Sequence, residues 1–68
     1  MEINLLVLSR REIEILRFMK KGLSSKEIAK SLQLSSHTID THRRNMLKKS
    51  RARNSVELVL YGVKSGMI

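Results

Sequence analysis

The sequence predicts an all-α fold, a compact four-helix bundle that contains a helix-turn-helix. Three observations support this prediction. The 68-residue chain has no proline and only three glycines, so little interrupts helix formation. Serine or asparagine precedes each of four stretches in which apolar residues recur every three or four positions. A brief break separates the second and third stretches, which is typical of two helices joined by a tight turn.

The first predicted helix begins after Ser9 and runs to about residue 21. Ser9 and Glu12 have the spacing of a capping box, in which each side chain accepts a hydrogen bond from the other residue's backbone N–H. Gly22 is well placed to end the helix, because glycine adopts the left-handed conformation of a C-terminal cap without strain. The residues expected to face the core are Ile15, Leu16 and Met19.

The second helix is predicted from Ser24 to about residue 32, and the third from Ser35 to about residue 49 or 50. Ser24 and Glu27 form another capping-box pattern, and Ser35 is a favourable N-cap. Ser50 falls on the apolar side of the third helix, so we expect loose packing at that helix end. The expected core residues of these two helices are Ile28, Ala29, Leu32, Ile39 and Met46.

The fourth helix is predicted to begin after Asn54, with Glu57 in a capping-box position, and to end at about residue 65. An apolar stripe with i, i+3, i+4, i+7 spacing is its expected core side, made of Val56, Val59, Leu60 and Val63. The opposite side, which carries Leu58, Tyr61 and Ser65, is expected to face outward. Gly62 would let a partner helix approach closely.

The chain is long enough for one domain, which we assign to residues 8–68, with residues 1–7 as a mobile lead-in or linker remnant. The absence of cysteine excludes disulfides and thiolate metal sites and suits a reducing cytosol. The apolar run at residues 5–8 is too short to span a bilayer or to act as a signal peptide. We therefore expect a cytoplasmic protein with no membrane partner.

The net charge of +8 indicates a polyanionic partner. Between residues 41 and 53 there are six basic residues and no acidic one. On the third helix, the side opposite the core carries His37, Thr41, Arg44 and Lys48, with Asp40 and Asn45 at its flanks. Contact with phosphates alone needs only cations, whereas recognition of base edges also needs short hydrogen-bonding groups. The pattern therefore predicts that this helix binds the major groove of double-stranded DNA.

Other classes of function find little support in the sequence. The chain has one Phe and one Tyr, which argues against binding of single strands by base stacking. No nucleophile, base or carboxylate pair is spaced as a catalytic site requires, so we expect neither an enzyme nor a cofactor. His37 and His42 lie five residues apart on different helix faces, without cysteine or an acidic cluster nearby, so we expect no metal.

Several motifs extend over nearly the whole chain, from residue 8 to about residue 61. Its first half contains Leu8-Ser9-x-Arg11-Glu12, Ile15-Leu16 and Gly22-Leu23-Ser24-x-Lys26-Glu27-Ile28-Ala29. Its second half contains Leu34-Ser35-x-x-Thr38-Ile39-x-x-His42 and Arg53-Asn54-x-x-Glu57-Leu58. With these motifs at this spacing, the chain resembles the LuxR/GerE-type helix-turn-helix domain, the C-terminal DNA-binding effector domain of many bacterial response regulators and quorum-sensing regulators.

The resemblance implies a four-helix fold of the winged-helix or homeodomain-like superclass, without a wing, acting in transcription regulation. The third helix, at about residues 36–50, would enter the major groove. The fourth would form a weak homodimer on paired half-sites through its outward side, Leu58, Tyr61 and Ser65, and because that patch is small, DNA would supply the rest of the dimer's stability. The residues at the family's base-reading positions are Asp40, Thr41 and Arg44. Those at its usual phosphate-contacting positions are Ser24, Lys26, Thr38, Arg43 and Lys48. The outward side of the third helix adds His37 and Asn45 as groove contacts.

Two questions stay open at the level of sequence. Position 40 is often basic in the family, and Asp40 has two possible roles: accepting a hydrogen bond from cytosine N4, or forming an i, i+4 ion pair that positions Arg44. The function also has an alternative of another class, a protein-interaction module. Such a module would contact RNA polymerase, as the similar sigma-factor region does, or would occupy another regulator's dimer face. Leu58 and Tyr61 motivate that alternative.

Overall fold

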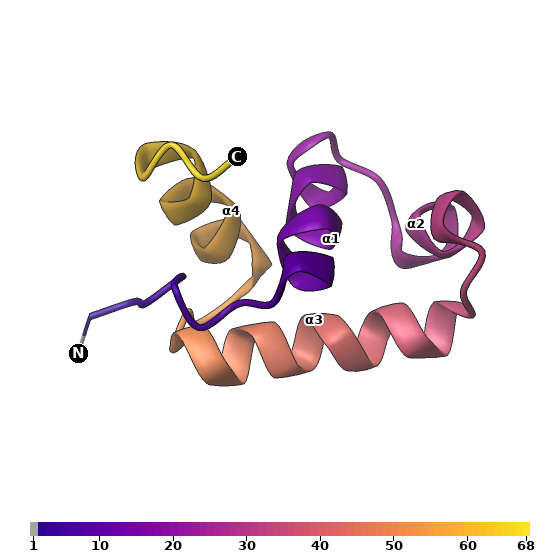
Figure 1. Cartoon of the computed structure of the whole chain (residues 1–68), viewed down its shortest axis with the longest axis horizontal. Helices are drawn as coiled ribbons and strands as arrows, with labels where there is room; N and C mark the ends of the chain where they lie inside the picture. The colour runs from indigo at the N-terminus through magenta and orange to yellow at the C-terminus, as the bar shows by residue number, and fades with distance from the viewer. Residues whose placement is uncertain (1) are drawn as a thin grey trace.

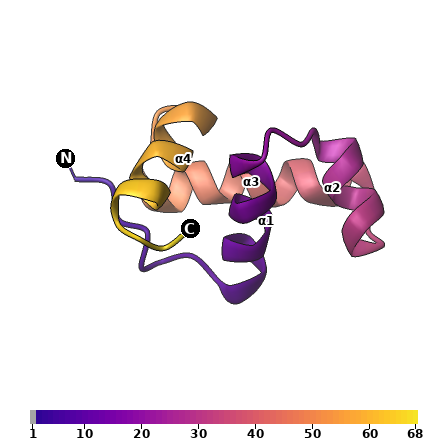
Figure 2. The ribbon, with the colours of Figure 1, turned by 90° about the horizontal axis from the view of Figure 1, so that it is seen from above.

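The computed structural model describes residues 2–68, which form four α-helices and no strand. The helices are α1 (Arg10–Lys20), α2 (Ser25–Leu32), α3 (Ser36–Ser50) and α4 (Ser55–Lys64). In Figure 1, α3 runs along the lower edge of the domain, and α1, α2 and α4 all lie above it. Figure 2 shows that α2 and α4 are at opposite ends of α3, with α1 between them. One long side of α3 is therefore not covered by another helix.

All four helices begin where their sequence signals predict. The side chains of the N-cap residues accept a hydrogen bond from the backbone N–H three positions on, at 2.9–3.2 Å; these caps are Ser9, Ser24, Ser35 and Asn54. In α1 and α2 the glutamate three residues later completes the capping box. In α4 the box is only half formed, because Glu57 accepts from the backbone N–H of Arg53 instead, at 2.9 Å.

The turns between helices also follow local chemistry. Gly22 has a φ of +84° and its N–H bonds to Met19, so α1 ends as predicted. The tight turn between α2 and α3 is made by Gln33, whose φ of 57° is left-handed. Arg51, with a φ of 68°, ends α3 in the same left-handed conformation.

The hydrophobic core lies between α1, α2 and α3 and extends to α4. The core residues predicted in the first three helices are buried, except Leu32, which packs at the edge. Ser50 is also fully buried, on the core side of α3 as the sequence predicts. Its hydroxyl donates to the Leu47 carbonyl at 3.4 Å and accepts from the Ala52 N–H at 3.3 Å. The buried hydroxyl therefore has both a hydrogen-bond acceptor and a donor as partners.

Part of the N-terminal segment, which the sequence analysis assigned to a lead-in, packs on the domain. Leu5 belongs to the core, Ile3 packs against it, and the Asn4 N–H donates to the Ser50 carbonyl at 3.0 Å. Residue 1 lies outside the described residues. The segment therefore covers the C-terminal end of α3, and burial of Leu5 accounts for its fixed position.

The sequence prediction for the two faces of α4 is wrong in part. Val59 packs against the core, and Tyr61 and Ser65 are exposed, as predicted. Leu58 is fully buried, whereas Val56, Leu60 and Val63 of the predicted core stripe are 69%, 55% and 46% exposed. Gly62 lies on the inner side with Leu58, where a Cβ would come within 2.8 Å of Ile68 and 3.2 Å of Leu16. The absence of a side chain thus lets α1 and the C-terminal residues pack closely against α4, and this approach determines which face is buried.

Candidate nucleic-acid interface

The uncovered side of α3 brings together the residues that the sequence predicts for base contact. His37, Arg44 and Lys48 are exposed there, with Asp40 and Asn45 exposed at its flanks. Thr41 is half-buried, and its hydroxyl donates to the His37 carbonyl at 3.0 Å. Two fully buried residues, Ile39 and Met46, hold the helix from behind. This side is therefore a polar, mainly cationic surface on a helix whose opposite side is fixed in the core.

Asp40 and Arg44 are four residues apart on α3, yet no ion pair joins them within the described part of the chain. The i, i+4 ion pair considered from the sequence is therefore absent. Both side chains are exposed and have no protein partner among residues 2–68. Their polar groups are consequently available to a ligand on the uncovered side of α3.

Three of the five predicted phosphate-contacting residues lie near helix N-termini. Ser24 and Lys26 are exposed at the start of α2, and Thr38 is half-buried in the first turn of α3. The Thr38 and Ser35 hydroxyl oxygens are 2.8 Å apart. Backbone N–H groups at a helix N-terminus carry partial positive charge, so these positions suit an anionic partner such as a phosphate.

Arg43 has a structural contact that the sequence analysis did not predict. Its guanidinium donates to the Ser25 hydroxyl at 2.9 Å and to the Ser55 hydroxyl at 3.3 Å. These serines are the first residues of α2 and α4, so one half-buried side chain joins three helices. The available signal was spacing: Arg43 follows the core residue Ile39 by four positions and therefore lies toward the same side of α3.

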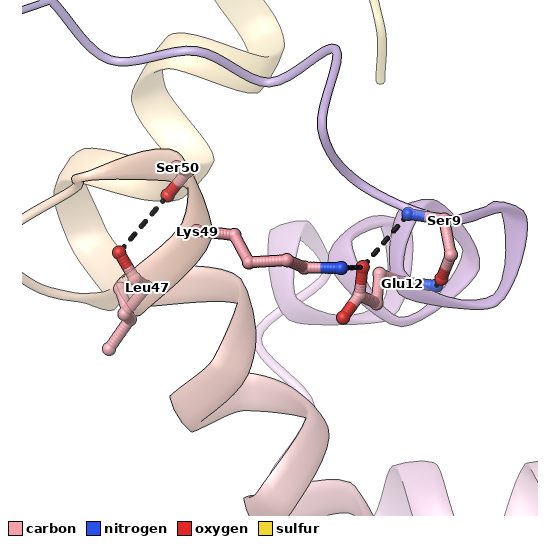
Figure 3. Close-up of polar contacts among 5 residues, drawn as sticks. All are labelled: Ser9, Glu12, Leu47, Lys49 and Ser50. Atoms are coloured by element: carbon pink, nitrogen blue, oxygen red, sulfur yellow. Dashed lines mark hydrogen bonds and ion pairs between the residues drawn. The ribbon is translucent and has the colours of Figure 1, made fainter.

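A second unpredicted contact joins the start of α1 to the end of α3. The Lys49 ammonium lies 2.6 Å from Glu12 Oε1, which also accepts the Ser9 backbone N–H at 2.8 Å (Figure 3). Burial raises the pKa of Glu12, but the hydrogen bonds from Lys49 and Ser9 outweigh it and hold the pKa below its ordinary value. Glu12 is thus an ionised structural residue, as its capping-box position indicated.

The outer surface of α4 differs from the predicted dimer face. Tyr61 and Ser65 are exposed, but Leu58 is buried and cannot contact a partner. The exposed apolar residues instead include Val56 and Leu60, which we call the α4 ridge. A groove lies on each side of this ridge, and both grooves include Val56 and Leu60 in their walls. One groove is also lined by Met19, Leu23 and Val59, and the other by Asn54, Glu57, Tyr61 and Lys64.

Two further observations concern residues 2–68. No group of three or more histidine, cysteine or acidic side chains is placed to hold a metal ion. None of these helices is long and apolar enough to cross a membrane.

Comparison with known proteins agrees with this geometry. Residues 6–62 match the family model described as bacterial regulatory proteins, luxR family. The chain is 42% identical over 60 residues to the regulatory protein SdiA of Escherichia coli, covering 88% of this chain and 25% of SdiA. It is 37% identical over 62 residues to the oxygen regulatory protein NreC of Staphylococcus carnosus, covering 91% of this chain and 29% of NreC.

A solved structure shows the same fold. The crystal structure of Escherichia coli SdiA superposes with a TM-score of 0.89 and 38% sequence identity, over 100% of this chain and 28% of that one. An uncharacterized response regulatory protein of Escherichia coli, YgeK, is 42% identical over 60 residues, which are 88% of this chain and 41% of YgeK. The chain therefore spans less than half the length of these relatives.

Proposed function

The chain belongs to the luxR family of bacterial regulatory proteins, a non-catalytic DNA-binding family, and from this premise we propose that α3 binds a specific sequence in the major groove of double-stranded DNA. The observation that carries the proposal is the uncovered side of α3, where cations and short polar groups are exposed together. The domain would act as the DNA-binding unit of a transcription regulator in the bacterial cytoplasm.

We assign the contacts by side-chain chemistry. Arg44 would donate to a guanine edge, Thr41 would contact a base or a thymine methyl group, and Asp40 would accept from a base. The phosphate and groove contacts would come from residues at the two N-termini and along α3, namely Ser24, Lys26, His37, Thr38, Asn45 and Lys48. Arg43 would contribute mainly by holding α3, since two of its N–H groups already bond to serines.

Paired substitutions on α3 test this assignment. Arg44→Ala should weaken binding to the preferred sequence by about 1–3 kcal/mol and relax the preference at one base pair. Lys48→Ala should weaken binding to all sequences alike and reduce the salt slope by about one unit. Fluorescence anisotropy with selected and scrambled duplexes at several salt concentrations measures both effects. Unchanged affinity and preference in Arg44→Ala would show that α3 does not enter the groove in this way.

We also propose a weak homodimer on DNA, formed through the α4 ridge with Tyr61 and Ser65 beside it. A ridge flanked by two grooves suits a symmetric contact, because the ridge of each copy can lie in a groove of the other. Leu60→Glu should abolish cooperative binding to paired half-sites while leaving binding to a single half-site unchanged. Equal cooperativity in wild type and Leu60→Glu, measured by gel shift, would exclude this contact.

The alternative is a protein-interaction module, and the exposed α4 ridge is the observation that favours it. In that case the ridge would contact RNA polymerase or another regulator, and α3 would not bind DNA. A gel shift at low salt with random and promoter duplexes separates the two proposals. Absence of any shift would favour interaction, whereas a salt-sensitive shift that depends on Arg44 would favour DNA binding.

A further inference from the structure

Most acidic residues of the chain have a structural role that the contacts identify. Four of the six acids cap a helix or form an ion pair, namely Glu12, Glu14, Glu27 and Glu57. The other two, Glu2 and Asp40, are exposed and make no hydrogen bond or ion pair within the described residues. Of these two, only Asp40 lies on α3, so the helix proposed to enter the groove carries one free carboxylate.

The cations nearest to Asp40 along α3 do not neutralise it. Arg43 is directed to the serines at the starts of α2 and α4. Arg44 lies four residues on and forms no ion pair with it. Asp40 therefore contributes nothing visible to the fold and places a negative charge beside the cationic surface of α3.

A free carboxylate at this position weakens the binding of α3 to most DNA sequences. Phosphates repel it, and in the major groove so do the acceptor atoms of guanine and the O4 atom of thymine. The groove offers donors only at cytosine N4 and adenine N6, and adenine also presents its N7 acceptor next to N6. A hydrogen bond donated by cytosine N4 therefore compensates best for this electrostatic repulsion of the carboxylate.

We propose that Asp40 is a specificity-determining residue that accepts a hydrogen bond from a cytosine N4 of the operator and lowers affinity for all other DNA. This inference rests on the proposed docking of α3 in the major groove. Arg44 lies about 6 Å further along the helix axis, and base pairs are stacked about 3.4 Å apart. The operator half-site should consequently contain a cytosine and the guanine contacted by Arg44 within one or two base-pair steps.

Selection of bound duplexes from a random library, followed by anisotropy titrations, tests the role of Asp40. Wild type should select cytosine at one position, and replacing that cytosine should weaken binding roughly 5- to 150-fold. Asp40→Ala should lose the cytosine preference and bind random duplexes roughly 2- to 5-fold more tightly. Asp40→Asn should prefer adenine at the same position, because an asparagine amide pairs with adenine N6 and N7.

Glu2→Gln is the matched control, since it removes the other free carboxylate and changes the net charge equally. It should leave the base preference and the affinity for random duplexes unchanged. Equal tightening by Glu2→Gln and Asp40→Ala would overturn the proposal, because net charge alone would then explain it. Retention of the cytosine preference in both Asp40 variants would also overturn it, while leaving the proposed DNA binding intact. Failure of wild type to bind any duplex would instead overturn the proposed function itself.

Discussion

The helix-turn-helix of α2 and α3 and the fourth helix use similar apolar patterns, but they differ in how firmly the sequence determines the buried face. On α3 the side opposite Ile39 and Met46 is entirely polar, so only one orientation buries apolar surface. On α4 apolar residues occur all round the helix, and three of the four residues in the stripe with the best helical spacing are exposed. A periodic pattern thus identifies the core face only where the other faces are polar.

The burial of Leu58 on α4 has a functional consequence. The helix buries Leu58 beside Gly62, and this leaves the α4 ridge in solvent. Adjacent exposed apolar residues are more informative than single ones about partner contacts. The helix-turn-helix therefore presents polar groups suited to DNA, while α4 presents apolar groups suited to another protein surface.

The largest expected effect tests which face of α4 supports the fold. Leu58→Ala should lower the free energy of unfolding by about 2–5 kcal/mol, because it removes a fully buried side chain and leaves a cavity. Val56→Ala, on the exposed ridge of the same helix, should change it by less than about 0.5 kcal/mol. Urea unfolding followed by circular dichroism measures both. Similar losses in the two variants would mean that the faces are assigned wrongly.

The next effect concerns the contact that fixes α3 against α1. Lys49→Met should lower the free energy of unfolding by about 1–2 kcal/mol, since it leaves the buried Glu12 carboxylate without its cation; partial exposure of Lys49 limits the loss. Lys48→Met is the control, because that side chain is exposed on the uncovered side of α3 and has no protein partner among residues 2–68. Equal stability of the two variants would contradict a structural role for the Lys49 contact.

The same contact makes stability depend on pH. The pKa of Glu12 in the folded chain lies below the ordinary value of 4.5, so the carboxylate stabilises the fold above that pH. This contribution should be lost as the pH falls from 4.5 through the lowered pKa. Glu12→Gln should reduce the loss of stability between pH 7 and pH 3 without removing it, because the pKa values of Glu27 and Glu57 are also lowered. An unchanged pH profile in Glu12→Gln would contradict this assignment.

A smaller effect tests the link between the two regions. Arg43→Met should lower the free energy of unfolding by about 1 kcal/mol, because the hydrogen bonds that join α3 to the starts of α2 and α4 are lost while the apolar stem is kept. Ser55→Ala should cause part of the same loss, and the double variant should lose less than the sum. Additive losses, measured in a double-mutant cycle, would show that the two side chains are not coupled.

The sequence predicted the helix starts, the core of the first three helices and the polar side of α3, because each depends on residues within a few positions of one another. The contacts of Lys49 and Arg43 join residues 12 to 37 positions apart, which local patterns do not encode. The face of α4 depends on Gly62 meeting Leu16 and Ile68. The buried Leu5 likewise needs the end of α3 to be in place. Tertiary packing decides these features.

The smallest expected effect, and the only stabilising one, lies in the turn of the helix-turn-helix. Gln33 holds a left-handed φ of 57°, which costs a residue with a side chain more than it costs glycine. Gln33→Gly should raise the free energy of unfolding by about 0.5–1 kcal/mol, with part of the relief offset by the greater freedom of glycine in the unfolded chain. No comparable gain should follow from Lys64→Gly, at the end of α4, where the backbone is helical. Urea unfolding followed by circular dichroism measures both variants, and equal stability of wild type and Gln33→Gly would contradict the cost assigned to the left-handed conformation of Gln33.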